Sequence, residues 1–199
     1  KGSDSLVVSD GSQFQVNDFA EIRQENGAWD SEPISWATYC VGQIVKITAI
    51  SGDTIWFHQP LRIDYDSTLN VEIRPFAPRH EVGIECLKIR RKDNASGNPF
   101  NIYYNYAVNC WIKGIESDSS VSSHIAANAS AHLEITGSYI HHAFEYTGSG
   151  TRGYGVVLIQ HTGDCLIENN IFRRLRHAMM VKQGANGNVF AYNYSRDVH

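Results

Sequence analysis

The sequence is short of several features that would narrow its class at once. It contains no run of about 18 consecutive apolar residues, so no segment is expected to cross a membrane. Lys and Arg number 17 against 21 Asp and Glu, and this lack of a basic surplus argues against a nucleic-acid partner. No signal peptide is present, yet the chain starts at Lys1 without an initiator Met and stops at His199 directly after a strand-like segment. We therefore expect a piece of a longer extracellular or cell-surface (secreted) polypeptide, truncated at its C-terminal end and accompanied by further domains.

The cysteines show no C-x-x-C spacing of the kind that binds metals. Buried free thiols are favoured over a disulfide pair. The repeat described next places Cys110 and Cys165 in one inward column but two coils apart, roughly 9–10 Å at the spacing of neighbouring strands. That separation exceeds the reach of a disulfide, so both cysteines are interpreted as core residues.

An internal repeat is the strongest signal in the sequence. Five pentapeptides share apolar first and third positions and, in most copies, a small or Asn fifth position, which is the alternation of a strand with one buried face. They are LKIRR (87–91), CWIKG (110–114), LEITG (133–137), CLIEN (165–169) and VFAYN (189–193), and their starts are separated by 23, 23, 32 and 24 residues. A second set, starting at Ile102, Ile125, Val157 and Val181, keeps the same spacing with the same lengthened step.

Such a repeat predicts a right-handed parallel β-helix. A unit of about 23 residues cannot bury its apolar face alone, so successive copies must stack. Equivalent strands then lie about 4.8 Å apart, and each inward side chain meets its counterpart one coil above. This fold requires Ile112, Ile135 and Ile167 to lie in a single column. Leucine-rich and helical repeats fit badly, because the period is two and Gly, Asn and β-branched residues dominate.

The N-terminal third follows a different pattern. Three alternating segments (13–24, 41–50 and 53–63) are separated by turn signals at Asn26-Gly27 and Ser51-Gly52-Asp53. We interpret Asn17 to Arg62 as a small antiparallel β insertion on the first coil segments, residues 1–69. The parallel coils are expected to run from residue 70 to residue 199.

The runs Ile167-Glu168-Asn169-Asn170-Ile171-Phe172 and Val189-Phe190-Ala191-Tyr192-Asn193-Tyr194 resemble the pectin-lyase-like superfamily of single-stranded right-handed β-helices. Asn169 and Asn193 are similar to the turn asparagines of its internal ladder. The resemblance covers about residues 70–199 and implies the fold. It implies no active site, because the Asn-Thr-Asp, Asp-Asp and Gly-His-Gly trio of polygalacturonases and the Trp-Ile-Asp-His stretch of pectate lyases are absent. Cys110-Trp111-Ile112-Lys113 shares only two letters with the latter.

Outward strand positions are the first candidate glycan-binding surface. Two exposed columns are expected, in which aromatic and cationic side chains such as Trp111 and Lys113 suit sugar rings and uronate carboxylates. A solvated or covered face is the competing interpretation. The expected columns are Lys88, Trp111, Glu134, Leu166 and Phe190, and Arg90, Lys113, Thr136, Glu168 and Tyr192.

The lengthened step of the repeat adds about nine residues, which would form a projecting loop. Its candidate catalytic residues are His141 and His142, and its candidate substrate-binding residues are Tyr146, Arg152 and Tyr154, an acid–base and anion-binding set. An ordinary polar loop is the alternative.

One coil later stands the cationic run Arg173-Arg174-Leu175-Arg176-His177, followed by Lys182. Its members Arg176 and His177, together with Lys182, complete the candidate catalytic set. β-Elimination on a uronate needs a cation to neutralise the carboxylate and a base to accept the neighbouring proton. These three residues beside His141, His142 and Tyr146 would make a lyase-like groove. Ordinary turn residues paired with Glu145, Asp164 or Glu168 are the simpler interpretation.

A metal site is not expected at the histidines, because adjacent strand residues should point to opposite faces. Ca²⁺ would be the cofactor if Glu116, Asp118, Glu134 and Glu145 converged, but the spacing does not require it. Two functions therefore stay open. One is binding or cleaving an acidic polysaccharide as a lyase- or epimerase-like protein, and the other is a non-catalytic structural or adhesive β-helix, such as a stalk or a tailspike-like binder.

Overall fold

The computed structural model describes residues 1–97, 99–145 and 152–197. The chain divides into two compact units, Lys1–Pro78 and Arg79–His199. Regular structure in the described ranges is nearly all strand, with two short 3₁₀ turns at Gly11–Gln13 and Ser35–Ala37. Within these ranges no helix has the length and apolar character needed to cross a membrane.

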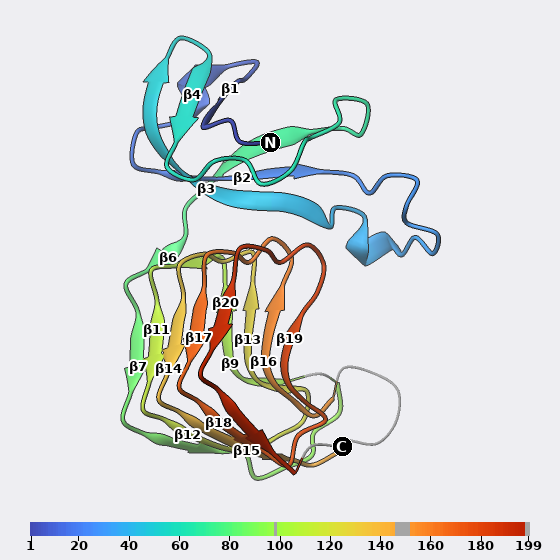
Figure 1. Ribbon diagram of the computed structural model, residues 1–199, viewed down its shortest axis with the longest axis vertical. Helices are drawn as coiled ribbons and strands as arrows, with labels where there is room; N and C mark the ends of the chain where they lie inside the picture. Colours follow the sequence, from blue (N-terminus) through green and yellow to red (C-terminus); the bar gives the residue numbers. More distant parts are fainter. Residues whose placement is uncertain (98, 146–151, 198–199) are drawn as a thin grey trace. The chain divides into compact units, whose positions relative to one another are not determined.

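The first unit is a five-stranded antiparallel sheet (Figure 1). Turn signals read from the sequence set its hairpin, because β3 and β4 are joined by Gly52 and Asp53, and Gly52 has the positive φ of +57° that such a tight turn needs. The strand order is β1-β4-β3-β2-β5. The strands are β1 (Ser5–Val7), β2 (Phe19–Gln24), β3 (Val41–Ser51), β4 (Thr54–Phe57) and β5 (Glu72–Phe76).

Residues 70–76 belong to this unit. β5 pairs antiparallel with β2, placing Ile73 opposite Ile22. Ile73 also packs against the buried cluster of this unit, which includes Val45 and Ile55. The division therefore falls between Pro78 and Arg79, because β5 finds its hydrogen-bonding partner in β2 and the coils begin only after it.

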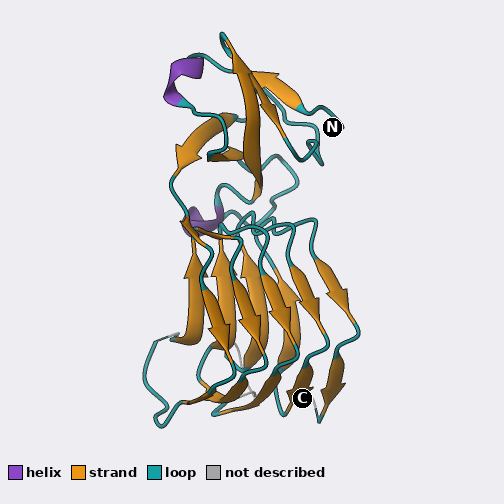
Figure 2. Cartoon of the chain, turned by 90° about the vertical axis from the view of Figure 1, so that its left-hand side faces the viewer, coloured by secondary structure: helices purple, strands orange, loops and turns teal. Residues whose placement is uncertain are grey.

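The second unit is the expected parallel β-helix. Its described strands form three parallel sheets that run side by side through successive coils (Figure 2). The first sheet contains β7 (Gly83–Glu85), β11 (Trp111–Lys113), β14 (Glu134–Thr136), β17 (Leu166–Glu168) and β20 (Val189–Ala191). The second contains β8 (Lys88–Arg90), β12 (Glu116–Ser120), β15 (Tyr139–Ala143), β18 (Ile171–Arg173) and β21 (Tyr194–Arg196). The third contains β9 (Phe100–Asn105), β13 (Ser123–Asn128), β16 (Tyr154–Ile159) and β19 (His177–Val181), and a short parallel pair joins β6 (Arg79–His80) to β10 (Ala107–Val108).

The aliphatic column on which the fold prediction depends is confirmed. Ile112 pairs with Ile135, Ile135 pairs with Ile167, and all three are fully buried. The ends of the column differ from the prediction. Ile84 precedes Ile112 in place of Ile89, and Phe190 follows Ile167 in place of Ala191.

The two differences at the ends of the column have a simple physical origin. LKIRR belongs to the second sheet, where Ile89 pairs with Ser117, and VFAYN is shifted by one residue. Either slip keeps the strand alternation, so periodicity alone cannot detect it. Leu87 and Val189, expected inside, are therefore exposed, and Phe190, expected outside, packs against the core. In the third sheet Ile102 and Ile125 are in register as predicted, but Val156 and Met179 continue their column in place of Val157 and Val181.

The turn between the first and second sheets contains a polar ladder. The side-chain oxygen of Asn193 accepts from the backbone N–H of Asn170, and that of Asn170 accepts from the N–H of Ser138, each at 3.0 Å. Asn170, and not Asn169 as expected, is therefore the ladder partner of Asn193. Asn169 instead has a positive φ of 55°, in the position that Gly137 fills one coil earlier with φ 61°. Cys110 and Cys165 are buried free thiols, as predicted.

Candidate functional site

The outward face of the second sheet gathers the polar and aromatic side chains of the β-helix. Because side chains alternate along a strand, Ile89, Ser117, Ile140 and Phe172 face inward and their neighbours face outward. Two outward columns result, in register from coil to coil: Lys88, Glu116, Tyr139, Ile171 and Tyr194, and Arg90, Asp118, His141, Arg173 and Arg196. Cations, carboxylates and aromatic rings thus meet on one surface.

The later coils of this face form an open groove of about 290 Å³. Tyr139, Ile171 and Tyr194 provide its apolar and aromatic lining, and Arg173 and Arg196 provide its positive charge. Tyr194 is 59% exposed and Ile171 is 48% exposed, so both offer area to a ligand. The groove therefore combines flat apolar surface with guanidinium groups.

Asp197 orients the two guanidinium groups. Its carboxylate accepts from Nε of Arg173 at 2.8 Å and from Nε of Arg196 at 3.3 Å. The hydrogen bond from Arg173 holds the pKa of Asp197 below its ordinary value, and it raises the pKa of Arg173 in return. Two cations against one carboxylate leave this end of the groove positive, in a chain whose net charge is −4.

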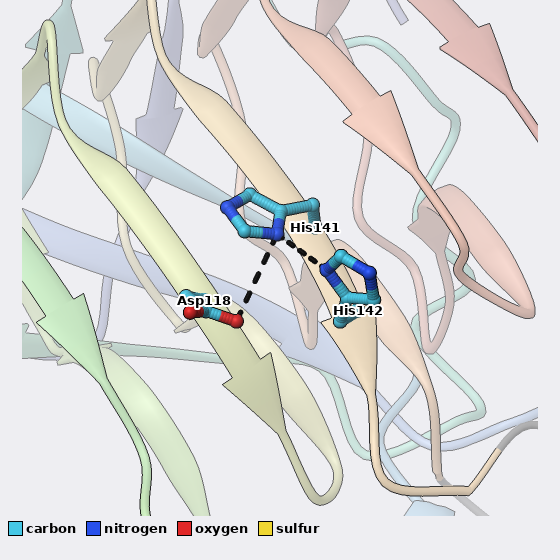
Figure 3. Close-up of side chains that lie close together, drawn as sticks. All are labelled: Asp118, His141 and His142. Atoms are coloured by element: carbon cyan, nitrogen blue, oxygen red, sulfur yellow. Dashed lines mark hydrogen bonds and ion pairs between the residues drawn. The ribbon is translucent and has the colours of Figure 1, made fainter.

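At the next strand toward the N-terminus, His141 and His142 face each other (Figure 3). The two Nδ1 atoms are 2.6 Å apart, and Asp118 Oδ1 lies 3.8 Å from His141 Nδ1. The expectation that adjacent histidines point to opposite faces is wrong, because His142 has a positive φ of 61° that departs from the strand alternation. His141 is buried and stacks on Tyr139 with ring centroids 4.1 Å apart, which joins the histidine pair to the groove.

The partners of the two rings fix their tautomers. Arg174 can only donate, so His142 Nε2, 3.0 Å from its guanidinium, must accept. The proton of neutral His142 is therefore on Nδ1 and is donated to His141 Nδ1. His141 in turn donates from Nε2 to Glu116 Oε1 at 3.0 Å. A continuous chain of hydrogen bonds thus runs from Arg174 through both rings to Glu116.

The surroundings shift several pKa values in this chain. A hydrogen bond from Lys88, followed by that from His141, lowers the pKa of Glu116. Burial, together with the neighbouring His141 and Arg174, lowers the pKa of His142. Behind the sheet, His124 donates to the backbone oxygen of His142 at 2.8 Å and accepts from Ser117 Oγ at 2.7 Å, and burial lowers its pKa to about 3.

Trp111 and Lys113 lie on the first sheet, away from this face. Trp111 donates from Nε1 to Glu85 at 2.6 Å, and its ring lies over Gly83, where an added Cβ would be 2.3 Å from the indole. Lys113 is exposed between Glu85 and Thr136. Of the two expected outward columns, only the central members are in register. Lys88 and Arg90 belong to the second sheet, and Tyr192 is a turn residue that is 85% exposed.

The remaining predicted residues form separate groups. Arg152 is paired with Glu145 at 2.8 Å. Tyr154 is buried in the third sheet, with the His177 ring at 5.2 Å and the Arg176 guanidinium at 5.9 Å from its ring centroid. Lys182 directly follows β19, and burial lowers its pKa. His177 thus begins β19 of the third sheet, with Arg176 directly before it, whereas His141 and His142 lie on the second sheet. Tyr146 lies outside the described residues.

Sequence reasoning missed the second-sheet repeat. Tyr194 and Arg196 were not among the candidate residues, Arg173 and Arg174 were considered only as part of the cationic run that ends at His177, and Glu116 and Asp118 were considered only as Ca²⁺ ligands. A signal was present, because the five residues after CWIKG, LEITG and CLIEN repeat at the same intervals as those pentapeptides, and a fourth copy begins at Asn193, the last residue of VFAYN. They are IESDS (115–119), SYIHH (138–142), NIFRR (170–174) and NYSRD (193–197). Aligning them would have placed the histidines beside Asp118 and the tyrosines in one column.

Three parallel sheets, stacked aliphatic columns and polar turn ladders define a right-handed parallel β-helix, here with a groove and a polar cluster on one sheet. Solved structures with the same fold include phage tailspikes. Against the Pseudomonas phage phi297 tailspike gp61 the TM-score is 0.73 at 13% identity, covering 100% of this chain and 32% of that chain. Against gp49 of Pseudomonas phage LKA1 it is 0.66 at 16% identity, covering 93% and 29%. This chain therefore spans about a third of the length of these tailspikes.

No protein-family model matches the chain, and no curated protein matches it in sequence. The likeness to the tailspikes is one of fold.

Proposed function

We propose that the β-helix unit binds an acidic polysaccharide in the groove of its second sheet. The observation that carries the proposal is the groove lining, in which Tyr139 and Tyr194 lie beside Arg173 and Arg196. Aromatic faces pack against sugar rings, and guanidinium groups form charge-assisted hydrogen bonds to uronate carboxylates. The local positive charge is notable in a chain that is negative as a whole.

The fold supports a wider proposal about the whole protein. We propose that the chain is part of an extracellular, tailspike-type protein with further domains, since it covers only 32% and 29% of the tailspikes it resembles. The three-sheet coil and the ladder of Asn170 and Asn193 support membership of the pectin-lyase-like superfamily.

The binding proposal is tested with matched tyrosine variants. Calorimetric titration with polygalacturonate and alginate, with neutral dextran as the control polymer, should give binding to the acidic polymers alone. Tyr194→Ala should weaken that binding roughly two- to twelvefold, the range expected for the loss of one aromatic contact. Tyr192→Ala removes an exposed ring that is not part of the groove lining and should change nothing.

Arg196→Ala should weaken binding of the acidic polymers by removing a charge-assisted contact. Equal binding by the Tyr192 and Tyr194 variants, or no binding to either acidic polymer, would contradict the groove assignment.

Cleavage of the bound polymer by β-elimination is a second candidate, favoured by the hydrogen-bond chain beside the groove. Arg174 would turn from His142 Nε2 to the uronate carboxylate, which frees the ring lone pair to accept the proton at C5. The C4–O bond then breaks, a C4–C5 double bond forms, and solvent protonates the leaving oxygen.

Absorbance of the unsaturated product tests the cleavage candidate. His142→Asn should abolish product formation while polymer binding persists, because Asn tolerates the positive φ of this position. His177→Ala, on the third sheet, is the control and should retain activity. A His142→Asn variant as active as the parent would exclude this role for the ring.

A further inference from the structure

The side chains of Asp118, His141 and His142 converge on one point of the second sheet (Figure 3). Their ligand atoms all lie within 4.8 Å of one another. We propose that these three residues form a binding site for a divalent transition-metal ion of the Zn²⁺ type. This inference does not rest on the proposed glycan binding, and it concerns a neighbouring part of the same face.

The donor set selects the class of metal. Two imidazole nitrogens with one carboxylate oxygen suit Zn²⁺ and related ions, whereas Ca²⁺ and Mg²⁺ prefer oxygen alone. The four carboxylates considered for Ca²⁺ do not gather, because Glu134 is on the first sheet and Glu145 is paired with Arg152. Among the described residues, the cluster of Asp118 and the two histidines is the one grouping of this kind.

The ligand atoms lie close enough for side-chain rotations to bring them to a tetrahedral site. Zn–N bonds of ~2.0–2.1 Å place tetrahedral ligand atoms ~3.3 Å apart. The two Nδ1 atoms are now closer than this, at 2.6 Å, and Asp118 Oδ1 is farther from His141 Nδ1, at 3.8 Å. Opening the histidine pair and moving the carboxylate inward would bring the three ligand atoms to this spacing and leave a fourth position open.

Two of the ligands already have hydrogen-bond partners that hold them in place. Glu116 accepts the Nε2 proton of His141, which leaves Nδ1 of this ring as a lone pair directed at the cluster. Arg90 holds the far oxygen of Asp118 at 3.4 Å, and Ser119 donates to Oδ1 at 2.9 Å. The carboxylate–histidine–metal arrangement fixes the ring orientation in the way that resident metal sites require.

The third ligand is held in the wrong tautomer by Arg174. His142 carries its proton on Nδ1 because Arg174 donates to Nε2. To bind a metal through Nδ1, His142 must move that proton to Nε2, and Arg174 must withdraw. Three cations, Lys88, Arg90 and Arg174, also border the cluster and oppose a further positive charge. Arg174 therefore acts as a competitor of the metal.

The experiment is isothermal titration of the chain with Zn²⁺, supported by the visible spectrum of the Co²⁺ form as a report on coordination. One ion per chain is expected, with no response to Ca²⁺ or Mg²⁺. His141→Gln, His142→Asn and Asp118→Asn should each weaken binding at least tenfold, while the control His177→Ala should leave it unchanged. Circular dichroism establishes that each variant is folded.

Arg174→Gln is the more decisive variant, because misfolding could weaken Zn²⁺ binding but could not strengthen it. The side-chain oxygen of the new glutamine can accept a hydrogen bond from Nε2 of His142, which leaves Nδ1 of that ring free to bind the metal. Zn²⁺ should therefore bind at least tenfold more tightly than in the parent chain. Lys88→Gln removes a positive charge that lies 3.8 Å from Asp118 and does not contact His142. It should give a smaller gain in Zn²⁺ affinity. Equal gains in both variants would overturn the tautomer argument. Zn²⁺ binding that survives both histidine changes, or no binding in any form, would overturn the site.

Discussion

The two units of the chain bury their strands by different means. In the antiparallel unit, paired residues come from unrelated positions of the sequence, so a carboxylate can face a cation, as where Glu21 pairs with Arg74. In the β-helix unit, partners come from the same position of successive repeats, so Ile112, Ile135 and Ile167 lie over one another. In this column the repeat places isoleucine next to isoleucine, and a charge placed there would meet apolar groups.

The antiparallel unit, in contrast, contains a charged group in its interior. Glu21 has no exposed surface, and its carboxylate accepts from Nε of Arg74 at 2.5 Å. The turn between the first and second sheets of the β-helix instead uses a neutral ladder of Ser138, Asn170 and Asn193. The comparison teaches that cross-strand pairing can complement a charge, whereas stacking of like residues favours groups that can both donate and accept.

The largest expected effect is at the centre of the aliphatic column. Ile135→Asp would bury a carboxylate between Ile112 and Ile167 with no partner, and it should destabilise the fold by more than about 4 kcal/mol. Chemical denaturation followed by circular dichroism measures the loss. Ile135→Val is the control and should cost about 1 kcal/mol. An unaltered unfolding curve for the aspartate variant would contradict the register.

The next effect breaks the charge pair of the antiparallel unit. Arg74→Ala would leave the Glu21 carboxylate buried without this partner, at a cost of about 3 kcal/mol, at the low end for such pairs because Arg74 is partly exposed. The double variant Glu21→Met with Arg74→Met should recover most of that stability. If the single variant unfolds at the same denaturant concentration as the parent, the pair does not stabilise the sheet.

A pH titration sharpens the comparison, because the β-helix buries an imidazole that stays neutral. His124 has a pKa of about 3 in the folded chain, lowered by burial, against about 6.5 when unfolded. Below about pH 6.5 the unfolded state binds a proton at His124 that the folded state does not bind. The contribution of His124 is therefore complete above this pH and is lost as the pH falls toward 3.

The measurement is the difference in unfolding free energy between the parent and His124→Gln across this range. That difference should shrink by up to about 1.4 kcal/mol per pH unit on acidification, because one proton is involved. A difference that stays constant between pH 7 and pH 4 would show that the ring is not held neutral.

The sequence predicted the fold well where repeats carry identical residues. Ile112, Ile135 and Ile167 are the same residue at the third position of three aligned pentapeptides, and the buried cysteines follow from that alignment. At both ends of the column the alignment failed, because a shift by one strand or by one residue leaves an alternating pattern that looks the same. Pairing partners, which decide the register, are fixed by turns that the pattern does not encode.

The candidate site was harder to predict for two physical reasons. Glu116 and Asp118 meet His141 from a coil 23 residues earlier, so their proximity appears only once the second sheet is in register. The direction of His142 depends on one backbone angle, its positive φ, which strand alternation cannot anticipate for a non-glycine residue. Both histidines were identified as candidates, but their shared geometry was not.

The smallest expected effect concerns a glycine with positive φ in a turn of each unit. Gly52 in the β3–β4 hairpin and Gly137 in the β-helix have φ values of +57° and +61°, and an added Cβ at either would meet no atom within 4 Å. The backbone conformation alone then sets the loss of stability, so Gly52→Ala and Gly137→Ala should each lower the unfolding free energy by about 1–2 kcal/mol. The β-helix offers a further comparison, because Asn169 adopts φ 55° at the position equivalent to Gly137. Gly137→Asn should therefore cost less than Gly137→Ala, and thermal melting of the three variants decides whether the turn conformation or a side-chain contact sets the preference.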